Sequence, residues 1–243
     1  MHIQVAAAKI GKYAAGESGD TLEMVERPHG GLSFVLADGQ RSGAAARAIS
    51  GMVTGKAVAL LAEGVRDGAA ARATHDYLFT QRRGKVSATL NIASVDTLTK
   101  TLVLSRNSPC PIVLQMSIRE QVILDAPTLP IGVHRGTKPQ IKEVPLRGGL
   151  VAVIYTDGLQ TAGERSGDLL DVPAYVADLY YRTIDRPLVA QPMADELLAE
   201  AVRRDGGRPQ DDMAVLVIAV LDTPSDDVRR LTVSFPIPPV LRP

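Results

Sequence analysis

Acidic residues stand at the ends of three apolar runs that lie far apart in the chain. Asp38-Gly39 closes GLSFVLADG, Asp157-Gly158 closes GLVAVIYTDG, and Asp211-Asp212 opens the apolar part of PQDDMAVLVIAV. Such runs are typical of buried strands, so a folded sheet could gather these carboxylates into one cluster. Crowded carboxylates repel one another and are normally neutralised by a hard cation. The sequence therefore predicts a divalent-metal site.

The glycine after each of the two aspartates has a chemical use of its own. Glycine adds no side chain, so the backbone can approach an ion closely and turn a carbonyl toward it. An Asp-Gly pair is also a common turn, and a single instance would indicate no more than that. Three acidic strand ends together favour a binding site over three unrelated turns.

The remaining metal-binding side chains favour oxygen coordination. The four histidines are scattered and form no zinc-binding spacing with one another or with the single cysteine, Cys110. Carboxylate and carbonyl oxygens are the ligands of magnesium and manganese. The expected cofactor is therefore Mn²⁺ or Mg²⁺.

The spacing of the apolar residues predicts a mixed α+β fold. Spacings of three and four predict helices over residues 42–63, 66–82, 173–181 and 193–204, the first of them capped by Ser42. Alternating and β-branched runs predict strands over residues 3–10, 21–26, 31–38, 86–94, 101–105, 112–116, 121–124, 141–145, 150–156, 213–221 and 228–234.

Consecutive strands with tight turns are typical of antiparallel sheets, whose outer faces the helices must then cover. We therefore expect a central antiparallel β-sandwich flanked by helical layers. A single domain is expected over residues 1–235, followed by a proline-rich tail over residues 236–243. Gly51 and Gly55 lie on one face of the first helix, which indicates either close packing against a neighbour or a helix that moves.

Composition argues against several classes of protein. The chain has 27 basic and 27 acidic residues, which removes the electrostatic footprint of a nucleic-acid binder. No apolar stretch reaches the about 18 residues of a membrane span, and the N-terminal apolar patch is interrupted by Lys9 and Lys12. One cysteine permits no internal disulfide. We expect a cytoplasmic protein that binds neither nucleic acid nor membrane.

Six segments, in order, resemble the successive motifs of the metal-dependent Ser/Thr protein phosphatases of the PPM superfamily, specifically its bacterial SpoIIE-like branch. They are ESGDTLEM, FVLADGQRSGAAA, SATLNIASVD, LPIGV, VIYTDGLQTAG and PQDDMAVLVIAV, and they span about Ala6 to Val220. The resemblance implies the αββα sandwich of that superfamily, two bound metal ions and a phosphorylated protein as substrate.

The resemblance also implies roles for individual residues. Asp38 would bridge two metal ions, with the Gly39 carbonyl on one of them, while Asp157 and Asp211 would hold the other. Asp38, Asp157 and Asp211 are thus the candidate catalytic residues. Asp20 resembles the first acidic position of the family, which lies beside the metals and acts directly or through water.

Only one residue of the Asp211-Asp212 pair is expected to face the cluster. Neighbouring residues on an extended strand point to opposite sides. The family pattern favours Asp211 and leaves Asp212 to a supporting or loop-fixing role.

The implied reaction is hydrolysis of phosphoserine or phosphothreonine on a bacterial signalling regulator, such as an anti-sigma-factor antagonist, by a metal-activated water. Control would come from a homodimer or a regulatory partner. Before Asp20 the chain offers only Lys12 where many relatives have a phosphate-binding arginine. Arg41 is the candidate substitute, because a guanidinium group pairs well with phosphate. The alternative interpretation is that Arg41 is solvated or forms a structural ion pair.

Other functions remain open beside this one. A catalytically weak module with the same fold could bind a phosphoprotein without hydrolysing it. A two-metal phosphatase or nuclease could act on small molecules or nucleic acid, although the neutral charge argues against the nuclease. A cysteine-dependent phosphatase is disfavoured, because the residue six positions after Cys110 is Met116 and not arginine.

Overall fold

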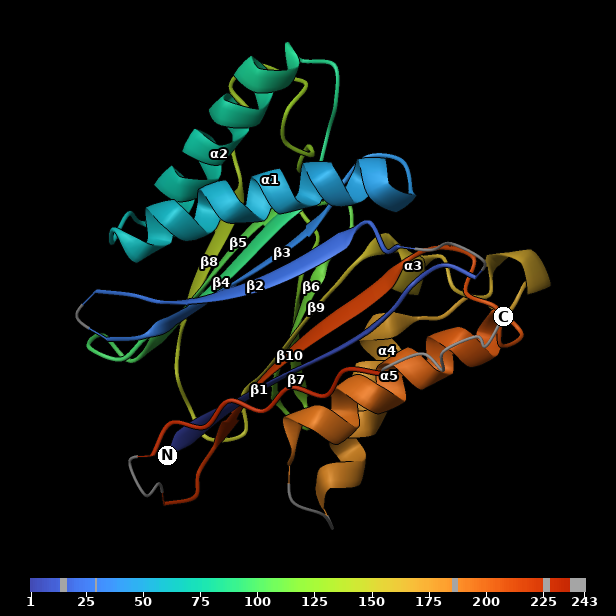
Figure 1. Cartoon of the computed structure of the whole chain (residues 1–243). Helices are drawn as coiled ribbons and strands as arrows, with labels where there is room; N and C mark the ends of the chain where they lie inside the picture. The colour runs from blue at the N-terminus through green and yellow to red at the C-terminus, as the bar shows by residue number, and fades with distance from the viewer. Residues whose placement is uncertain (14–16, 29, 185–187, 225–227, 237–243) are drawn as a thin grey trace.

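Two antiparallel sheets lie face to face between two layers of helices (Figure 1). The computed structural model describes residues 1–13, 17–28, 30–184, 188–224 and 228–236. One sheet has the order β1 (His2–Ile10), β10 (Met213–Leu221), β9 (Val151–Tyr155), β6 (Ile112–Ser117), β7 (Glu120–Leu124). The other has the order β2 (Asp20–Glu26), β3 (Leu32–Asp38), β4 (Leu90–Asp96), β5 (Thr101–Asn107), β8 (Gln140–Pro145). The predicted α+β sandwich is confirmed.

The helices divide between the two outer faces. The β2–β8 sheet is covered by α1 (Gly43–Ala62) and α2 (Asp67–Arg82). The β1–β7 sheet is covered by α4 (Val172–Tyr181) and α5 (Ala190–Arg204). Shorter helical segments are α3 (Asp157–Gln160), η1 (Glu164–Ser166) and η2 (Arg182–Ile184).

Three apolar layers hold the four structural layers together. Leu36 and Ile154 belong to the cluster between the two sheets. Val35, the next residue along β3, belongs instead to the cluster under α1 and α2. Successive side chains of a strand point to opposite faces, so a strand that is buried on both faces must be apolar throughout. This explains the continuous apolar runs in the sequence.

Helix α1 is a core helix with one open face. By length and composition it is the one described helix that could cross a membrane, whereas no apolar stretch of that length was expected from the sequence. Its buried face, which includes Val53 and Leu61, packs on the β2–β8 sheet. Gly51 and Gly55 face solvent, and a Cβ at either position would meet no atom within 4 Å. The close-packing explanation of these glycines is therefore wrong.

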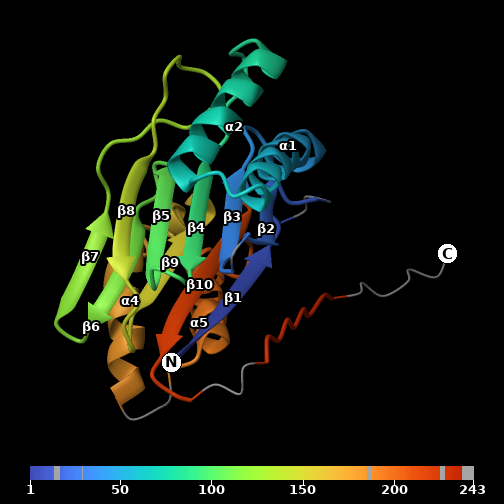
Figure 2. The ribbon, with the colours of Figure 1, turned by 90° about the vertical axis from the view of Figure 1, so that its left-hand side faces the viewer.

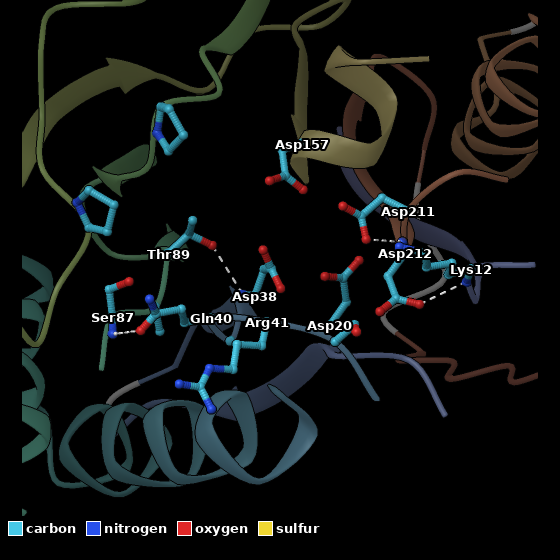
Figure 3. A pocket seen from close by; sticks show the side chains of 15 residues that line it. Lys12, Asp20, Asp38, Gln40, Arg41, Ser87, Thr89, Asp157, Asp211 and Asp212 are labelled. Atoms are coloured by element: carbon cyan, nitrogen blue, oxygen red, sulfur yellow. Dashed lines mark hydrogen bonds between the residues drawn. The ribbon is translucent and has the colours of Figure 1, made fainter. Parts of the chain in front are cut away.

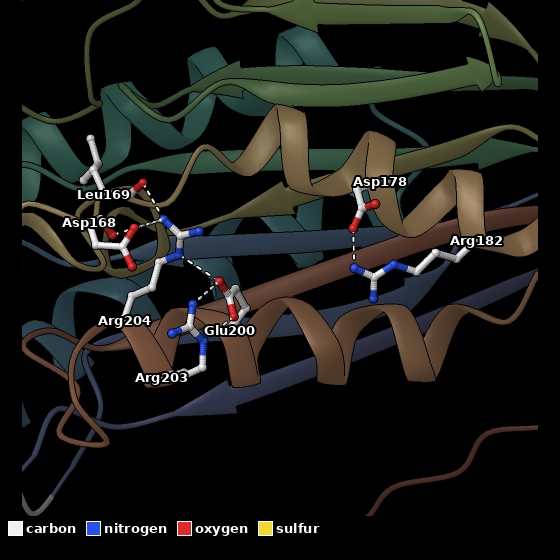
Figure 4. Close-up of polar contacts among 7 residues, drawn as sticks. All are labelled: Asp168, Leu169, Asp178, Arg182, Glu200, Arg203 and Arg204. Atoms are coloured by element: carbon white, nitrogen blue, oxygen red, sulfur yellow. Dashed lines mark hydrogen bonds and ion pairs between the residues drawn. The ribbon is translucent and has the colours of Figure 1, made fainter.

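The C-terminal end of α5 is tied to the segment before α4 by a cluster of ion pairs (Figure 4). Glu200 accepts hydrogen bonds from Arg203 and Arg204, and these arginines lower the pKa of its carboxyl group to about 2. Arg204 also donates to Asp168 Oδ1 at 3.0 Å and to the carbonyl of Leu169 at 2.7 Å. The helical layer is thereby fixed to the loop that follows α3.

One predicted strand is absent, and another strand begins late. The strand predicted over 228–234 does not form; residues 228–236 have no regular structure, and Figure 2 shows them extended away from the sheets. Asp157, which directly follows the predicted strand over 150–156, begins a short helix. β4 begins at Leu90, because Ala88 makes only isolated bridges, to Gly39 and Ile131.

Candidate metal centre

The predicted acidic residues meet in one cavity at one end of the sandwich. The cavity has a volume of about 500 Å³ and is lined by Lys12, Asp20, Asp38, Gly39, Gln40, Arg41, Ser42, Ser87, Ala88, Thr89, Pro109, Pro130, Asp157, Asp211 and Asp212. Figure 3 shows carboxylates from both sheets on facing walls. All five predicted metal-ligand residues therefore line a single space.

Asp20 and Asp38 are cross-strand partners on one wall. Asp20 is the first residue of β2, Asp38 is the last residue of β3, and the antiparallel register pairs them directly. The side chains of directly opposed residues lie on the same face of a sheet. The end of β3 is also fixed to Thr89, whose Oγ1 accepts a hydrogen bond from Asp38 N at 3.0 Å.

Burial and mutual repulsion make these carboxyl groups reluctant to ionise. Desolvation, followed by the charges of Asp20, Asp157 and Asp211, raises the pKa of Asp38 to about 9. Desolvation also raises the pKa of Asp20 to about 7, opposed by a hydrogen bond from Thr156. The pKa of Asp157 is raised by burial and by the charge of Asp211. A cation bound in the cavity would oppose these shifts and favour the ionised carboxylates.

The facing wall comes from the β1–β7 sheet. Asp157 follows β9, and Asp211 precedes β10, the strand paired with β9. Gly158 allows these two segments to touch, because a Cβ there would lie 2.1 Å from the carbonyl oxygen of Asp212. The glycine after Asp157 is therefore required by packing between backbones.

Gly39 has a similar steric role beside α1. A Cβ on Gly39 would lie 2.2 Å from the carbonyl oxygen of Ala46. Any side chain at this position would push α1 away from the end of β3. The structure thus gives a packing reason for the glycine in addition to the predicted carbonyl ligand.

Asp212 fixes the loop between β1 and β2. Its Oδ1 accepts a hydrogen bond from Lys12 N at 2.8 Å, and its Oδ2 accepts one from Gly19 N at 2.7 Å. Both oxygens are used for the backbone, so the loop-fixing role predicted for Asp212 agrees with the geometry. Asp211 is the more accessible of the two residues.

The cavity fits hard cations. Oδ1 of Asp20 is buried and has no hydrogen-bond partner among the described residues, an arrangement that is unfavourable unless something else binds the oxygen. No three Asp, Glu, His or Cys side chains of the described residues close around one point. The carboxylates instead line an open space, which suits Mg²⁺ or Mn²⁺ because such ions keep several water ligands.

Arg41 stands at the rim of the cavity in a strained conformation. Its φ is 83°, in the left-handed region that non-glycine residues rarely adopt. The side chain is exposed, and the residue directly precedes Ser42, the N-cap of α1, whose own side chain makes no capping hydrogen bond. Arg41 forms no salt bridge with any of the described residues. The interpretation of Arg41 as a structural ion-pair residue therefore lacks support.

Three polar residues that were not predicted from the sequence support Asp20. The carbonyl of Asp20 accepts hydrogen bonds from Lys9 Nζ and from Arg47 Nη1, the latter at 2.9 Å. Thr156 donates to its carboxylate. The only sequence signal was that Thr156 directly precedes an Asp-Gly pair.

Comparison with protein families identifies the chain. The family model for stage II sporulation protein E (SpoIIE) matches residues 28–221, which is most of the sequence. The chain belongs to the SpoIIE family. No curated protein sequence matches it at a significant level.

Solved structures of phosphatase domains share the fold of this SpoIIE-family chain. A PP2C phosphatase domain of SpoIIE from Bacillus subtilis, with a fragment of its regulatory domain, matches with a TM-score of 0.76 at 20% identity, over 90% of this chain and 64% of that one. RsbX in complex with magnesium matches with a TM-score of 0.68 at 16% identity, over 89% and 94% of the chains. The catalytic domain of the serine/threonine phosphatase PstP with two manganese ions matches with a TM-score of 0.66 at 17% identity, over 90% and 99%.

Proposed function

We propose that this chain is a Mn²⁺- or Mg²⁺-dependent protein phosphatase that hydrolyses phosphoserine or phosphothreonine. The observation that carries the proposal is the convergence of Asp20, Asp38, Asp157 and Asp211 on one cavity. Their raised pKa values and the unpartnered oxygen of Asp20 call for positive charge in that space. Membership of the SpoIIE family supports the same activity.

The proposed ligands are Asp20, Asp38, the carbonyl of Gly39, Asp157 and Asp211, which would hold two ions. RsbX with magnesium and PstP with two manganese ions support this cofactor. When bound, the ions would supply a water of lowered pKa and neutralise the charge of the phosphate. The carboxylates would orient the ions, and the cavity volume of about 500 Å³ leaves space for a phosphoryl group beside them.

Arg41 is the proposed contact for the substrate phosphate. A guanidinium group binds phosphate oxygens through two parallel hydrogen bonds. The strained backbone of Arg41 is consistent with a residue that is retained for function, because such strain concentrates at functional sites. Lys12, on the loop fixed by Asp212, is the other cation that lines the cavity.

The proposed substrate is a phosphorylated bacterial regulator, such as an anti-sigma-factor antagonist, in the cytoplasm. A family whose model is named for a sporulation protein supports a signalling role. Cys110 is buried, and a single cysteine fits a reducing compartment. Regulation would come from a partner protein or a homodimer.

A comparison of substrates tests the proposal. The chain is incubated in saturating Mn²⁺ with a phosphoserine peptide, a small phosphate ester and single-stranded DNA, and released phosphate or cleaved strands are measured. We expect release of phosphate from the peptide and no cleavage of DNA. Binding of the peptide without release, measured by fluorescence anisotropy, would instead support the phosphoprotein-binding module.

A further inference from the structure

The hydroxyl group of Thr156 connects the two sheets at the acidic cavity. Thr156 is buried and follows β9, whereas Asp20 begins β2 in the opposite sheet. Thr156 Oγ1 lies 2.9 Å from Asp20 Oδ2 and donates to it, and it accepts a hydrogen bond from Ala214 N, also at 2.9 Å. The carbonyl of Ala214 is farther from the hydroxyl, at 3.4 Å. The shorter distance assigns the single hydroxyl proton to Asp20.

Thr156 uses its hydroxyl for this contact in place of a helix cap. It occupies the N-cap position of α3, where a threonine oxygen usually accepts a hydrogen bond from the first turn, a contact worth about 1 kcal/mol. Here the side chain makes no such bond. The local helix therefore does not explain the orientation of the hydroxyl.

The hydrogen bond from Thr156 occupies one of the two equivalent oxygens of the Asp20 carboxylate and leaves the other at a fixed position. The backbone of Asp20 is held by Lys9 and Arg47 at its carbonyl oxygen. Thr156 occupies Oδ2, and Oδ1 is buried with no geometric hydrogen-bond partner among the described residues. In the metal-free chain the neighbouring Asp38 carboxyl group shares a side-chain hydrogen bond with Asp20, and a bound cation would replace that proton. The bond to Thr156 fixes the orientation of the carboxylate plane, because any intermediate rotation would break it. The carboxylate is thus fixed with one oxygen available.

We propose that Thr156 is a positioning residue that holds Asp20 with Oδ1 available to a divalent cation. This inference rests on the proposed function. Groups that hydrogen-bond to a metal ligand orient it, and their removal typically weakens metal binding by about 10- to 100-fold. Thr156 would thereby couple the β9 end of one sheet to the acidic wall of the other.

Calorimetric titration of the metal-free chain with Mn²⁺ tests this role. Thr156→Val removes the hydroxyl and keeps the shape of the side chain, whereas Thr156→Ser keeps the hydroxyl. We expect Thr156→Val to weaken Mn²⁺ binding by about 10-fold or more and Thr156→Ser to bind within about threefold of the wild type. Thermal unfolding in EDTA records the separate effect of each change on the fold.

A double-mutant cycle with Asp20→Asn separates positioning from general structural damage. If Thr156 acts through Asp20, Thr156→Val will not weaken Mn²⁺ binding further in the Asp20→Asn background. Equal weakening in both backgrounds, or wild-type affinity in Thr156→Val, would overturn the inference while the wild type still binds Mn²⁺. Absence of Mn²⁺ binding by the wild type would overturn the proposed function and the inference with it.

Discussion

At the scale of single residues, Asp38 is a partly buried acid at the end of β3 and the proposed ligand shared by the two ions. In the metal-free chain its pKa of about 9 keeps the carboxyl group protonated at neutral pH. Asparagine resembles the protonated acid in size and polarity but cannot supply a negative ligand. The same substitution therefore separates folding from metal binding.

We predict that Asp38→Asn leaves the fold intact and lowers phosphate release from a phosphoserine peptide by at least about 100-fold, since an anionic ligand of the ions is lost. In EDTA at pH 8 its melting temperature should equal or exceed that of the wild type, because a buried group that resists ionisation has been replaced. Circular dichroism and a phosphate assay measure the two effects. Retention of a substantial fraction of activity would contradict the role of Asp38.

Arg41 allows a prediction in which stability and activity move in opposite directions. Arg41→Gly should stabilise the chain by about 1 kcal/mol, because glycine adopts positive φ without strain. It should also lower kcat/KM for the phosphopeptide by about 10-fold, since a phosphate contact is removed. Denaturant unfolding and steady-state kinetics give the two values.

Arg83 provides a matched control for this substitution. It is exposed and has a φ of 54°, but it ends α2 and does not line the cavity. Arg83→Gly should stabilise the chain without changing kcat/KM. If Arg41→Gly behaves in the same way, Arg41 is a strained surface residue without a role in substrate binding.

The sequence predicted which aspartates lie at strand ends, but it did not predict the groups that support them. Asp38 and Asp157 could be placed because each closes an apolar run, whereas Asp20 was identified only by the family resemblance. The bond between Thr156 and Asp20 joins residues 136 positions apart and depends on how two sheets are stacked. Sequence periodicity assigns residues to faces of a strand and contains no information about which residue of the other sheet lies opposite.

At the scale of elements, α1 connects the cavity to the helical layer. Arg47 holds the Asp20 carbonyl, and Ser50 Oγ lies 2.6 Å from Thr21 Oγ1 on β2. The Ala46 carbonyl lies against Gly39. A shift of α1 would therefore change the positions of both Asp20 and Asp38.

Replacement of both exposed glycines of α1 tests whether this helix moves. Gly51→Ala with Gly55→Ala should raise the free energy of unfolding, by up to about 1 kcal/mol for each position, because alanine favours the helix and each Cβ enters open space. If flexibility of α1 controls the site, the Mn²⁺ concentration for half-maximal activity should change as well. An unchanged Mn²⁺ dependence would restrict these glycines to an effect on stability.

The wrong strand prediction shows why alternation alone is insufficient. Leu231, Val233 and Phe235 alternate with polar residues, as in a half-buried strand, but they are 73%, 76% and 83% exposed. A strand requires a neighbouring edge to accept its hydrogen bonds, and no described strand pairs with this segment. The availability of an edge is a property of the whole sheet and is absent from the local sequence.

At the scale of the whole molecule, the acidic cavity should make stability depend on pH and on the proposed metal ions. The raised pKa values of Asp20 and Asp38 mean that the folded chain retains protons that the unfolded chain has released above about pH 4. Folding then becomes less favourable as pH rises from about 4 through the folded values of about 7 and about 9.

We predict that the melting temperature in EDTA falls by roughly 5 °C between pH 6 and pH 9, and that Mn²⁺ removes or reverses the fall, because the ions bind the ionised carboxylates. Thermal unfolding at several pH values, with and without Mn²⁺, measures the effect. Asp38→Asn should show a smaller fall than the wild type in EDTA. If the melting temperature in EDTA falls equally with pH in Asp38→Asn and in the wild type, Asp38 does not contribute to the pH dependence of stability.

The most direct test of metal-dependent hydrolysis is the rate of phosphate release from a phosphoserine peptide as a function of Mn²⁺ concentration, measured for the wild type and for Asp157→Asn. The predicted result is no release in EDTA, a rise to saturation with Mn²⁺ for the wild type, and little or no release at any Mn²⁺ concentration for Asp157→Asn. Release in EDTA at the rate seen with Mn²⁺, or no release by the wild type at any concentration, would contradict the assignment of this cavity as the active site of a metal-dependent phosphatase.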